Sequence, residues 1–481
     1  KKINWIPSHI QEGRFGEWLR ELKDWAISRE RYWGTPLPIW ECEKNEDHKL
    51  VAGSLADLDK HAYYKNRFFI ARHAESDHNL HDNIASGLEK GSNISKLTEK
   101  GKKQAEKLGI ILKKRSINVI YASPYFRTRQ TAQIIAKIVG VEVYTDKRLG
   151  EINCGIFNGR PVEEHRKFFQ EPIERFTKTP PGGENYTDLK SRMMEFLRET
   201  NEKHLGKNIL IVSHGDPLIV LEGTAQGFPN EKILAVPSLL VGGHKEISLP
   251  NWPFDKEGSL DLHRPFVDAV VLKCPECGAQ MRRIKEVADV WFDSGAMPFA
   301  QWHYPFDNKE LIDNGSQFPA DYIAEGIDQT RGWFYTLLAV STLLKRGISY
   351  KNVICLGLLL DKHGQKMSKS KGNVVDPSEV IKKYGADVLR WYFYTVNPPG
   401  EPKRFDENDL RKTFNKLFML LYNSFVFYNT YGKEKAKPIK VLDEWILARL
   451  NETVKITTEN LDKYEVGEAG RFIEGFVEDL S

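Results

Sequence analysis

The sequence predicts an α/β protein with an all-α end, and two observations carry this prediction. Between residues 66 and 248, short apolar runs alternate with helix-like stretches, which is typical of a mostly parallel sheet covered on both faces. Beyond Phe405, apolar residues such as Leu410, Phe414 and Leu417 recur at helical spacing. A chain of 481 residues is long enough for about three domains.

Composition excludes several classes of protein. Hydrophobic residues make up 41% of the chain and charged residues 28%, so a wholly disordered protein is excluded. No stretch reaches the roughly 18 apolar residues that span a bilayer, and we expect no membrane partner. The net charge of +4 permits a nucleic-acid partner without requiring one. Five cysteines, an odd number, favour a reducing compartment, so we expect a cytoplasmic protein.

Four apolar runs are the expected strands of the first α/β domain. They cover residues 68–71, 119–122, 141–144 and 209–212. The expected helices between them cover residues 98–114, 124–139 and 186–204. Strands and helices that alternate in this way form a parallel sheet, and ligands bind at the carboxyl ends of such strands.

Residues suited to phosphate follow three of these strands. Arg72 and His73 follow the first, Arg127 lies one helical turn beyond the second, and His214 follows the last. Guanidinium groups match phosphate oxygens, and a histidine can act as the nucleophile of a two-step phosphoryl transfer. A leaving alkoxide needs a proton, for which Glu151 is the candidate donor.

These residues lie in an ordered series of motifs: Arg72-His73-Ala74-Glu75, Ser123-Pro124 with Arg127, Leu149-Gly150-Glu151 and Ser213-His214-Gly215. The series resembles the histidine phosphatase (phosphoglycerate mutase-like) superfamily over about residues 66–248. The resemblance implies that His73 is the nucleophile, that Arg72, Arg127 and His214 bind phosphate, and that Glu151 donates the proton. Ala74 stands where the family usually has glycine, and a retained fold with an inactive pocket is the alternative. We interpret His78 and His81 as part of a solvated loop.

The flanks of this domain contain a second kind of motif, Lys366-Met367-Ser368-Lys369-Ser370. Two lysines on a polar, Gly-flanked loop can neutralise the charge that develops as pyrophosphate leaves a triphosphate. A solvated run of charges is the alternative interpretation.

Together with residues 24–40, 289–301 and 325–334, this loop resembles the isoleucyl-tRNA synthetase family of class I aminoacyl-tRNA synthetases. The resemblance implies a Rossmann domain that uses ATP with Mg²⁺ to activate isoleucine and then acylates tRNA-Ile. It implies that Glu325, with Asp328 and Gln329, contacts the adenylate. It also implies that Trp291 and Trp333 wall the side-chain pocket, and that Lys369 is the mobile cation within the nucleotide-binding set Lys366, Met367, Ser368 and Ser370. The alternative for both tryptophans is ordinary core packing.

Two parts of that family are missing from the sequence. No His-x-Gly-His motif occurs among the thirteen histidines, and the editing domain that precedes the Trp25 region is absent. The start, Lys1 to Trp5, lacks an initiating methionine and a signal-peptide core. We therefore expect an incomplete chain that does not activate isoleucine alone.

Cys274-Pro-Glu-Cys277-Gly indicates one half of a tetrahedral zinc site. Related synthetases supply the other half from a cysteine pair, but this chain has Cys42 and then Asn45. Asp47 or His48 is the candidate fourth ligand beside the three thiols. The alternative is that the three thiols simply pack.

The predicted layout is therefore an insertion. Residues 1–65 and 249–400 form the synthetase catalytic region with its zinc knuckle, residues 66–248 form the phosphatase-like insert, and residues 401–481 begin the anticodon-binding helices. We expect a monomer that binds tRNA-Ile, isoleucine, ATP and, on the insert, a phosphate ester. Two alternatives stay open: a phosphatase whose flanks are only a binding scaffold, and a silent insert that contacts tRNA.

Overall fold

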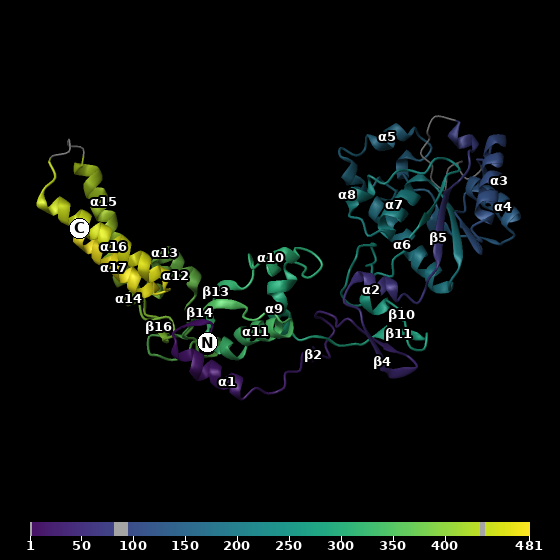
Figure 1. Cartoon of the computed structure of the whole chain (residues 1–481). Helices are drawn as coiled ribbons and strands as arrows, with labels where there is room; N and C mark the ends of the chain where they lie inside the picture. Colours follow the sequence, from purple (N-terminus) through teal and green to yellow (C-terminus); the bar gives the residue numbers. More distant parts are fainter. Residues whose placement is uncertain (1, 81–94, 433–437) are drawn as a thin grey trace. The chain divides into compact units, whose positions relative to one another are not determined.

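The computed structural model of the chain describes residues 2–80, 95–432 and 438–481 (Figure 1). The chain divides into two compact units, one of residues 28–288 and one of residues 1–27 with 289–481. Each unit has its own sheets and its own apolar core. Across the described residues, no helix combines the length and the apolar character that a membrane span requires.

The unit of residues 28–288 contains a five-stranded sheet with the order β7-β6-β8-β5-β9. Its strands are β5 Arg67–Arg72, β6 Val119–Ala122, β7 Val143–Thr145, β8 Asn208–Ser213 and β9 His244–Ile247. The first four strands in that order run parallel, and β9 runs antiparallel to β5. Central β8 aligns Ser213 with Arg72 and Val212 with Ala122, so three carboxyl strand ends meet at one edge.

Helices cover both faces of this sheet (Figure 1). Alternate residues of β5 enter different cores: Phe68 packs with residues of α6 and α7, whereas Phe69 packs with residues of α3 and α4. This alternation follows from the two-residue period of a strand. The helices are α3 Glu99–Lys113, α4 Phe126–Val139, α5 Val162–Arg166, α6 Tyr186–Lys203, α7 Gly215–Ala225 and α8 Asn230–Ile233. The predicted parallel sheet with two covered faces is confirmed.

Local sequence sets where these helices begin and end. The Thr98 hydroxyl accepts a hydrogen bond from the Gly101 amide and caps α3. Asn185 and Asp188 form a reciprocal capping box at the start of α6. Gly140, with φ of 85°, ends α4 in the left-handed conformation that favours glycine.

A second, four-stranded antiparallel sheet belongs to the same unit, with the order β10-β11-β3-β4. It packs around buried Trp40, Leu272 and Met281. The further elements of this unit are β2 Ser28–Arg29, β3 Ile39–Cys42, β4 Asn45–Val51, α2 Leu55–Lys60, β10 Leu272–Lys273, β11 Gln280–Arg283 and β12 Val287–Ala288.

The other unit begins with a parallel three-stranded sheet of the order β1-β14-β13. Trp5, Phe334 and Val353 are among its fully buried core residues. Its elements are β1 Asn4–Ile6, α1 Gly16–Arg20, α9 Val290–Ala300, α10 Lys309–Asp313, β13 Ala320–Gly326, α11 Trp333–Leu343, β14 Tyr350–Leu356, β15 Leu359–Leu360 and β16 Lys403–Arg404.

The last part of that unit is helical, as the spacing beyond Phe405 predicts. Its helices are α12 Pro377–Tyr384, α13 Ala386–Thr395, α14 Glu407–Thr413, α15 Leu420–Tyr431, α16 Val441–Asp462 and α17 Val466–Leu480. A π-helical turn at Phe414–Met419 joins α14 to α15. Residues 433–437, between α15 and α16, lie outside the described residues.

Candidate functional site

The residues that the strand ends predicted to bind phosphate do meet in one cluster, whose His73, Arg127 and His214 are buried. Arg72 ends β5, His73 follows it, and His214 stands between β8 and α7. Arg127 lies in the first turn of α4, just after the end of β6. His73, Arg127 and His214 are all at least nine-tenths buried.

The protonation state of His73 follows from its two contacts. Arg127 Nε donates a hydrogen bond to His73 Nε2 over 3.1 Å. A guanidinium can only donate, so Nε2 carries a lone pair and Nδ1 carries the proton, which it donates to the Ala74 carbonyl over 2.9 Å. Burial, followed by the charge of Arg127, lowers the pKa of His73 well below its usual value. His73 is therefore a neutral imidazole, and the Nε2 lone pair, which could serve as a nucleophile, accepts the hydrogen bond from Arg127 in this arrangement.

His214 is held in the same manner by the other side of Arg127. Arg127 Nη2 donates to His214 Nδ1 over 3.1 Å, which leaves Nε2 to donate to the Ser123 hydroxyl over 2.8 Å. The His73 and His214 rings lie 5.3 Å apart. Burial and the charge of Arg127 also lower the pKa of His214. One buried guanidinium thus sets the tautomers of both histidines.

Arg72 supplies the second guanidinium of the pocket. Its Nη1 donates to the Leu239 carbonyl over 3.0 Å. Its Nε is buried and finds no hydrogen-bond partner among the described residues. A buried donor of this kind is costly unless a ligand accepts from it. Gly215 passes close by, since a Cβ there would stand 3.5 Å from Arg72 Cζ.

Glu151 follows the 3₁₀ turn Lys147–Leu149 and lies beside His214, with its Oε2 3.8 Å from His214 Nδ1. Burial raises the pKa of Glu151 to about 7, and the negative charge of Asp216 adds to the rise. The carboxyl group therefore holds a proton near neutrality, as a general acid must.

Sequence reasoning missed two residues around this pocket and misread one. Asp216 raises the pKa of Glu151, and the Tyr125 ring lies 4.7 Å from that of His214. His78 is half-buried and lines the cavity beside Arg72, so its interpretation as part of a solvated loop is wrong. His81 lies outside the described residues. Asp216 and Tyr125 could have been found from their place in the sequence. Asp216 lies two residues after the motif residue His214, and Tyr125 lies two residues after the motif residue Ser123.

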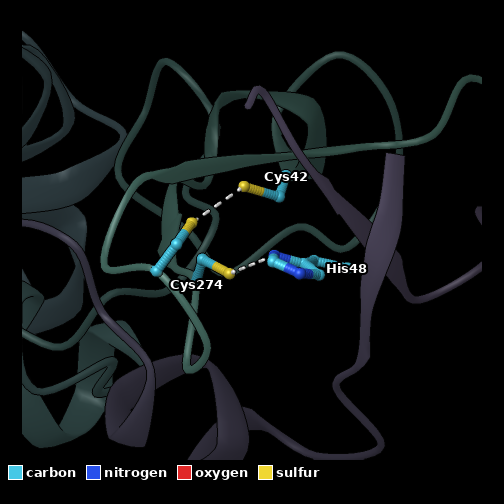
Figure 2. A group of neighbouring side chains, drawn as sticks. Cys42, His48 and Cys274 are labelled. Carbon is cyan, nitrogen blue, oxygen red and sulfur yellow. Dashed lines mark hydrogen bonds between the residues drawn. The ribbon is translucent and has the colours of Figure 1, made fainter. Parts of the chain in front are cut away.

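Four metal-ligating side chains converge in the small antiparallel sheet (Figure 2). Cys42, His48, Cys274 and Cys277 bring one ligand atom each to within 4.8 Å of one another. Cys42 Sγ lies 3.5 Å from Cys277 Sγ, and Cys274 Sγ lies 3.6 Å from His48 Nδ1. Three thiols and one imidazole are a donor set that suits tetrahedral Zn²⁺. Of the two alternatives for the fourth position, His48 joins the thiols and Asp47 does not.

Asn45, which occupies the position where a cysteine was expected, contacts the far side of the histidine. Its Nδ2 lies 3.1 Å from His48 Nε2, and its Oδ1 accepts from the Asp47 amide over 3.0 Å. The Asn45 side chain therefore orients the His48 ring from outside the cluster.

Residues predicted to contact an adenylate lie together at the end of β13. Glu325 is exposed on that strand, and Asp328 and Gln329 follow in a 3₁₀ turn. Gln329 donates to Asp328 Oδ2 over 3.0 Å and accepts from the Trp333 amide over 2.9 Å. Trp291 reaches the same place, since a Cβ on Gly332 would stand 3.2 Å from its ring.

The loop of residues 366–370 is held by side-chain hydrogen bonds. Asn373 accepts from the Ser368 amide over 2.9 Å and donates to Asp361 over 2.8 Å. Ser368 and Ser370 hydroxyls lie 3.2 Å apart, and Met367 packs against a buried cluster. Lys366 is exposed, and the Lys369 side chain lies outside the described part. Within that part, the loop makes no hydrogen bond or ion pair with Glu325, Asp328 or Gln329.

Comparison with known families separates the same two kinds of motif. Residues 1–97 and 255–405, just over half of the chain, match the family of class I tRNA synthetases (I, L, M and V). The chain belongs to this family. Within the synthetase chain, residues 68–240 match the histidine phosphatase superfamily, branch 1. Both resemblances drawn from the sequence are confirmed.

Curated relatives of the synthetase chain are isoleucine–tRNA ligases. The protein of Dehalococcoides mccartyi (strain ATCC BAA-2266) is 47% identical over 491 aligned residues, which cover 100% of this chain and 30% of that protein. The Clostridium novyi protein is 50% identical over 231 residues, 46% of this chain and 22% of that protein. The Thermus thermophilus protein is 32% identical, and the alignment covers 100% of this chain and 28% of that protein. The chain thus spans less than a third of the length of these relatives.

Solved structures similar to part of this chain include proteins whose names describe hydrolases or phosphatases. A mycobacterial glucosyl-3-phosphoglycerate phosphatase is 22% identical, covers 37% of this chain and 88% of its own, and gives a TM-score of 0.34. Bacillus stearothermophilus YhfR is 26% identical, with a TM-score of 0.34. The match covers 41% of this chain and 95% of the YhfR chain.

Proposed function

We propose that this chain is part of an isoleucine–tRNA ligase that carries a second, phosphatase active site on an inserted domain. The alignment to isoleucine–tRNA ligases, which covers all of this chain, supports the ligase function. The pocket of His73, Arg127 and His214 supports the phosphatase function. The match of both flanks to the synthetase family favours a catalytic role for them over that of a binding scaffold.

The domain layout of the proposal follows the two family matches. We assign residues 66–248 to the insert and residues 1–65 and 249–400 to one catalytic region. The matches of residues 68–240 to one family and of residues 1–97 and 255–405 to the other support this assignment. Residues 401–481 begin the anticodon-binding helices. In the longer protein, this region uses ATP with Mg²⁺ to activate isoleucine and transfers it to tRNA-Ile, as a cytoplasmic monomer.

Roles within the ligase site are part of the same proposal. Glu325, Asp328 and Gln329 contact the adenylate, while Trp291 and Trp333 wall the pocket for the isoleucine side chain. Lys369, with Lys366, neutralises the leaving pyrophosphate. The hydrogen bonds from Gln329 to its neighbours support a fixed orientation for this turn.

On the insert, His73 Nε2 attacks the phosphorus of a phosphomonoester. A nitrogen–phosphorus bond forms while the bond to the leaving oxygen breaks, and Glu151 gives its proton to that oxygen. Water then attacks the phosphohistidine, Glu151 takes a proton from that water, and phosphate leaves. Arg72, Arg127 and His214 hold the phosphoryl oxygens throughout.

The cluster of Cys42, His48, Cys274 and Cys277 is proposed to hold one structural Zn²⁺. The donor set and the mutual distances support this assignment. An ion held there would tie the turn between β10 and β11 to β3 and β4 and would have a structural role only.

The phosphatase proposal is tested by turnover of an aryl phosphate. His73→Ala is expected to lower the rate at least about a thousandfold, because the nucleophile is lost. His263→Ala is the matched control, since His263 is exposed and belongs to the same unit. Equal rates for wild type and His73→Ala would contradict the proposal. For the ligase, isoleucine-dependent exchange of pyrophosphate into ATP by the longer protein is the corresponding test.

A further inference from the structure

The positive charge of the chain is concentrated on α3 and α4, which lie side by side on one face of the five-stranded sheet (Figure 1). Residues 99–139, which contain both helices, have ten lysines and arginines against two glutamates. The whole chain has 70 basic and 66 acidic residues, so the remainder has 60 basic against 64 acidic residues. On the other face of the same sheet, α6 and α7 together carry four basic and six acidic residues. The excess positive charge therefore belongs to one layer of the insert.

Both helices present this charge to solvent in rows. On α3, Lys103, Lys107 and Lys114 are exposed, and spacings of four and seven residues place them on one side of a helix. At 1.5 Å of rise per residue, they follow one another at about 6 Å and about 10 Å along the helix axis. On α4, Arg129 and Lys137 are exposed and lie eight residues apart, again on one side. The two rows form one basic surface, which we call the α3–α4 face.

The charges of the α3–α4 face are not neutralised by carboxylates. Lys100 pairs with Glu75 over 2.7 Å, and Lys102 pairs with Glu99 over 2.6 Å. Glu106, the other acidic residue of α3, pairs with none of the remaining basic side chains. Within the part of the chain that the structure describes, no ion pair is formed by any of the five residues of the rows: Lys103, Lys107, Lys114, Arg129 and Lys137. Like charges on one surface repel one another, and a bound polyanion would relieve this repulsion.

The other side chains of the α3–α4 face decide which polyanion suits it. Its exposed large apolar residues are Ile110 and Ile111, and no aromatic residue of either helix is exposed. Proteins that hold single-stranded bases stack them on aromatic rings, so this surface suits a phosphate backbone instead. A helix that lies in a membrane needs a free apolar face, whereas Ala105, Leu108 and Leu112 of α3 are buried in the protein. A nucleic-acid backbone is therefore favoured over an anionic membrane.

We propose that the α3–α4 face binds the phosphate backbone of tRNA, so that the insert contacts RNA in addition to its phosphatase role. The sequences on both sides of the insert match the tRNA synthetase family, which is the reason for choosing RNA; for that choice alone the inference rests on the proposed ligase function. Contacts to phosphates carry no sequence information. We therefore expect this surface to raise the affinity for cognate and non-cognate tRNA by the same factor.

The experiment measures the binding of a fluorescently labelled tRNA-Ile transcript to the 481-residue chain by anisotropy at several salt concentrations. The triple variant Lys103→Gln, Lys107→Gln, Lys114→Gln should raise Kd at least about tenfold. The slope of log Kd against log salt should become shallower by about two to three, because each lost phosphate contact removes about 0.7–0.9. The double variant Arg129→Gln, Lys137→Gln should raise Kd at least about fivefold and provides an independent test of α4. A non-cognate transcript should lose affinity by the same factors.

The matched control is the triple variant Lys167→Gln, Lys203→Gln, Lys232→Gln, which removes the same charge from exposed lysines of the same unit outside α3 and α4. Its Kd should stay within about twofold of wild type. Thermal midpoints of unfolding and turnover of an aryl phosphate should be equal for all variants, which separates RNA binding from folding and from the phosphatase pocket.

Three results would overturn the inference. The first is a wild-type chain that does not bind the transcript at about 50 mM salt, and the second is an equal rise of Kd in the control and in the α3 variant. The third is an α3 variant that keeps its affinity for RNA but no longer sediments with phosphatidylglycerol vesicles, which would assign the surface to a membrane. Failure of the ligase proposal would appear separately, as a lack of isoleucine-dependent pyrophosphate exchange by the longer protein, measured without added tRNA.

Discussion

At the scale of single residues, Glu151 should set how the proposed phosphatase reaction depends on pH. It must be protonated to serve the leaving group, and its pKa is raised to about 7. We expect kcat/KM for an aryl phosphate to fall as pH rises through about 7. Glu151→Asn or Glu151→Gln should lower the rate about a hundredfold or more and abolish this limb of the profile. A limb that persists in Glu151→Gln would assign the titration to another group.

The same residue links pH to stability. A carboxyl group whose pKa rises on folding stabilises the folded protein most at pH values below its unfolded pKa of 4.5. This stabilisation is lost as the pH rises through the folded pKa of about 7. The shift corresponds to about 3 kcal/mol, at about 1.4 kcal/mol per pKa unit. Urea unfolding should therefore find Glu151→Gln more stable than wild type at pH 8, with a smaller difference at pH 5. Glu106→Gln, at an exposed position, should show no such trend.

Sequence alone could place Arg72, His73, Arg127 and His214 together because parallel strands end at one edge. It could not supply what depends on tertiary neighbours. Asp216 affects Glu151 only because the fold brings the two acids together. In the same way, tertiary packing buries the His165 ring beside Phe157 and Phe169, and its Nε2 has no hydrogen-bond partner among the described residues. Charge environment and burial of this kind have no signature in local spacing.

At the scale of elements, β4 explains why His48 rather than Asp47 joins the thiols. Neighbouring residues on a strand point to opposite faces, so only one of the two can face Cys274. The Cys-x-x-Cys turn was predictable from its spacing, whereas the choice between two adjacent side chains required the register of β4 against β3.

The zinc assignment leads to a prediction with a control one residue away. His48→Ala should lose most of the bound zinc after dialysis, because three thiols alone leave the tetrahedral site incomplete. Asp47→Ala should retain about one zinc per chain. Metal content by atomic emission, with the thermal midpoint of unfolding, makes the comparison. Wild-type protein that is stable and free of metal after purification without chelators would contradict the assignment.

At the scale of the whole molecule, the two candidate sites of the chain are built from different residues. Every protein contact described for His73, Arg127 and His214 comes from residues 28–288, whereas Glu325, Gln329 and Trp333 belong to the other unit. The alternation of strands and helices predicts α/β structure on both sides, but pattern alone does not divide the chain between two families. The motifs do divide it, because each motif indicates one kind of chemistry, and the motifs of the synthetase family lie in segments on both sides of the phosphatase motifs.

Because the residues assigned to the two candidate sites lie in different units, the two activities should be separable in the longer protein. His73→Ala should abolish turnover of an aryl phosphate and change isoleucine-dependent pyrophosphate exchange less than about twofold. Lys369→Ala should lower that exchange at least about tenfold, since it removes a cation from the leaving pyrophosphate, and should leave aryl phosphate turnover unchanged. The 481-residue chain itself, which has no His-x-Gly-His motif, should turn over the aryl phosphate without any exchange activity. If His73→Ala lowered exchange as strongly as it lowered phosphatase turnover, the two sites would be coupled, and the phosphate pocket would act within the ligase reaction rather than beside it.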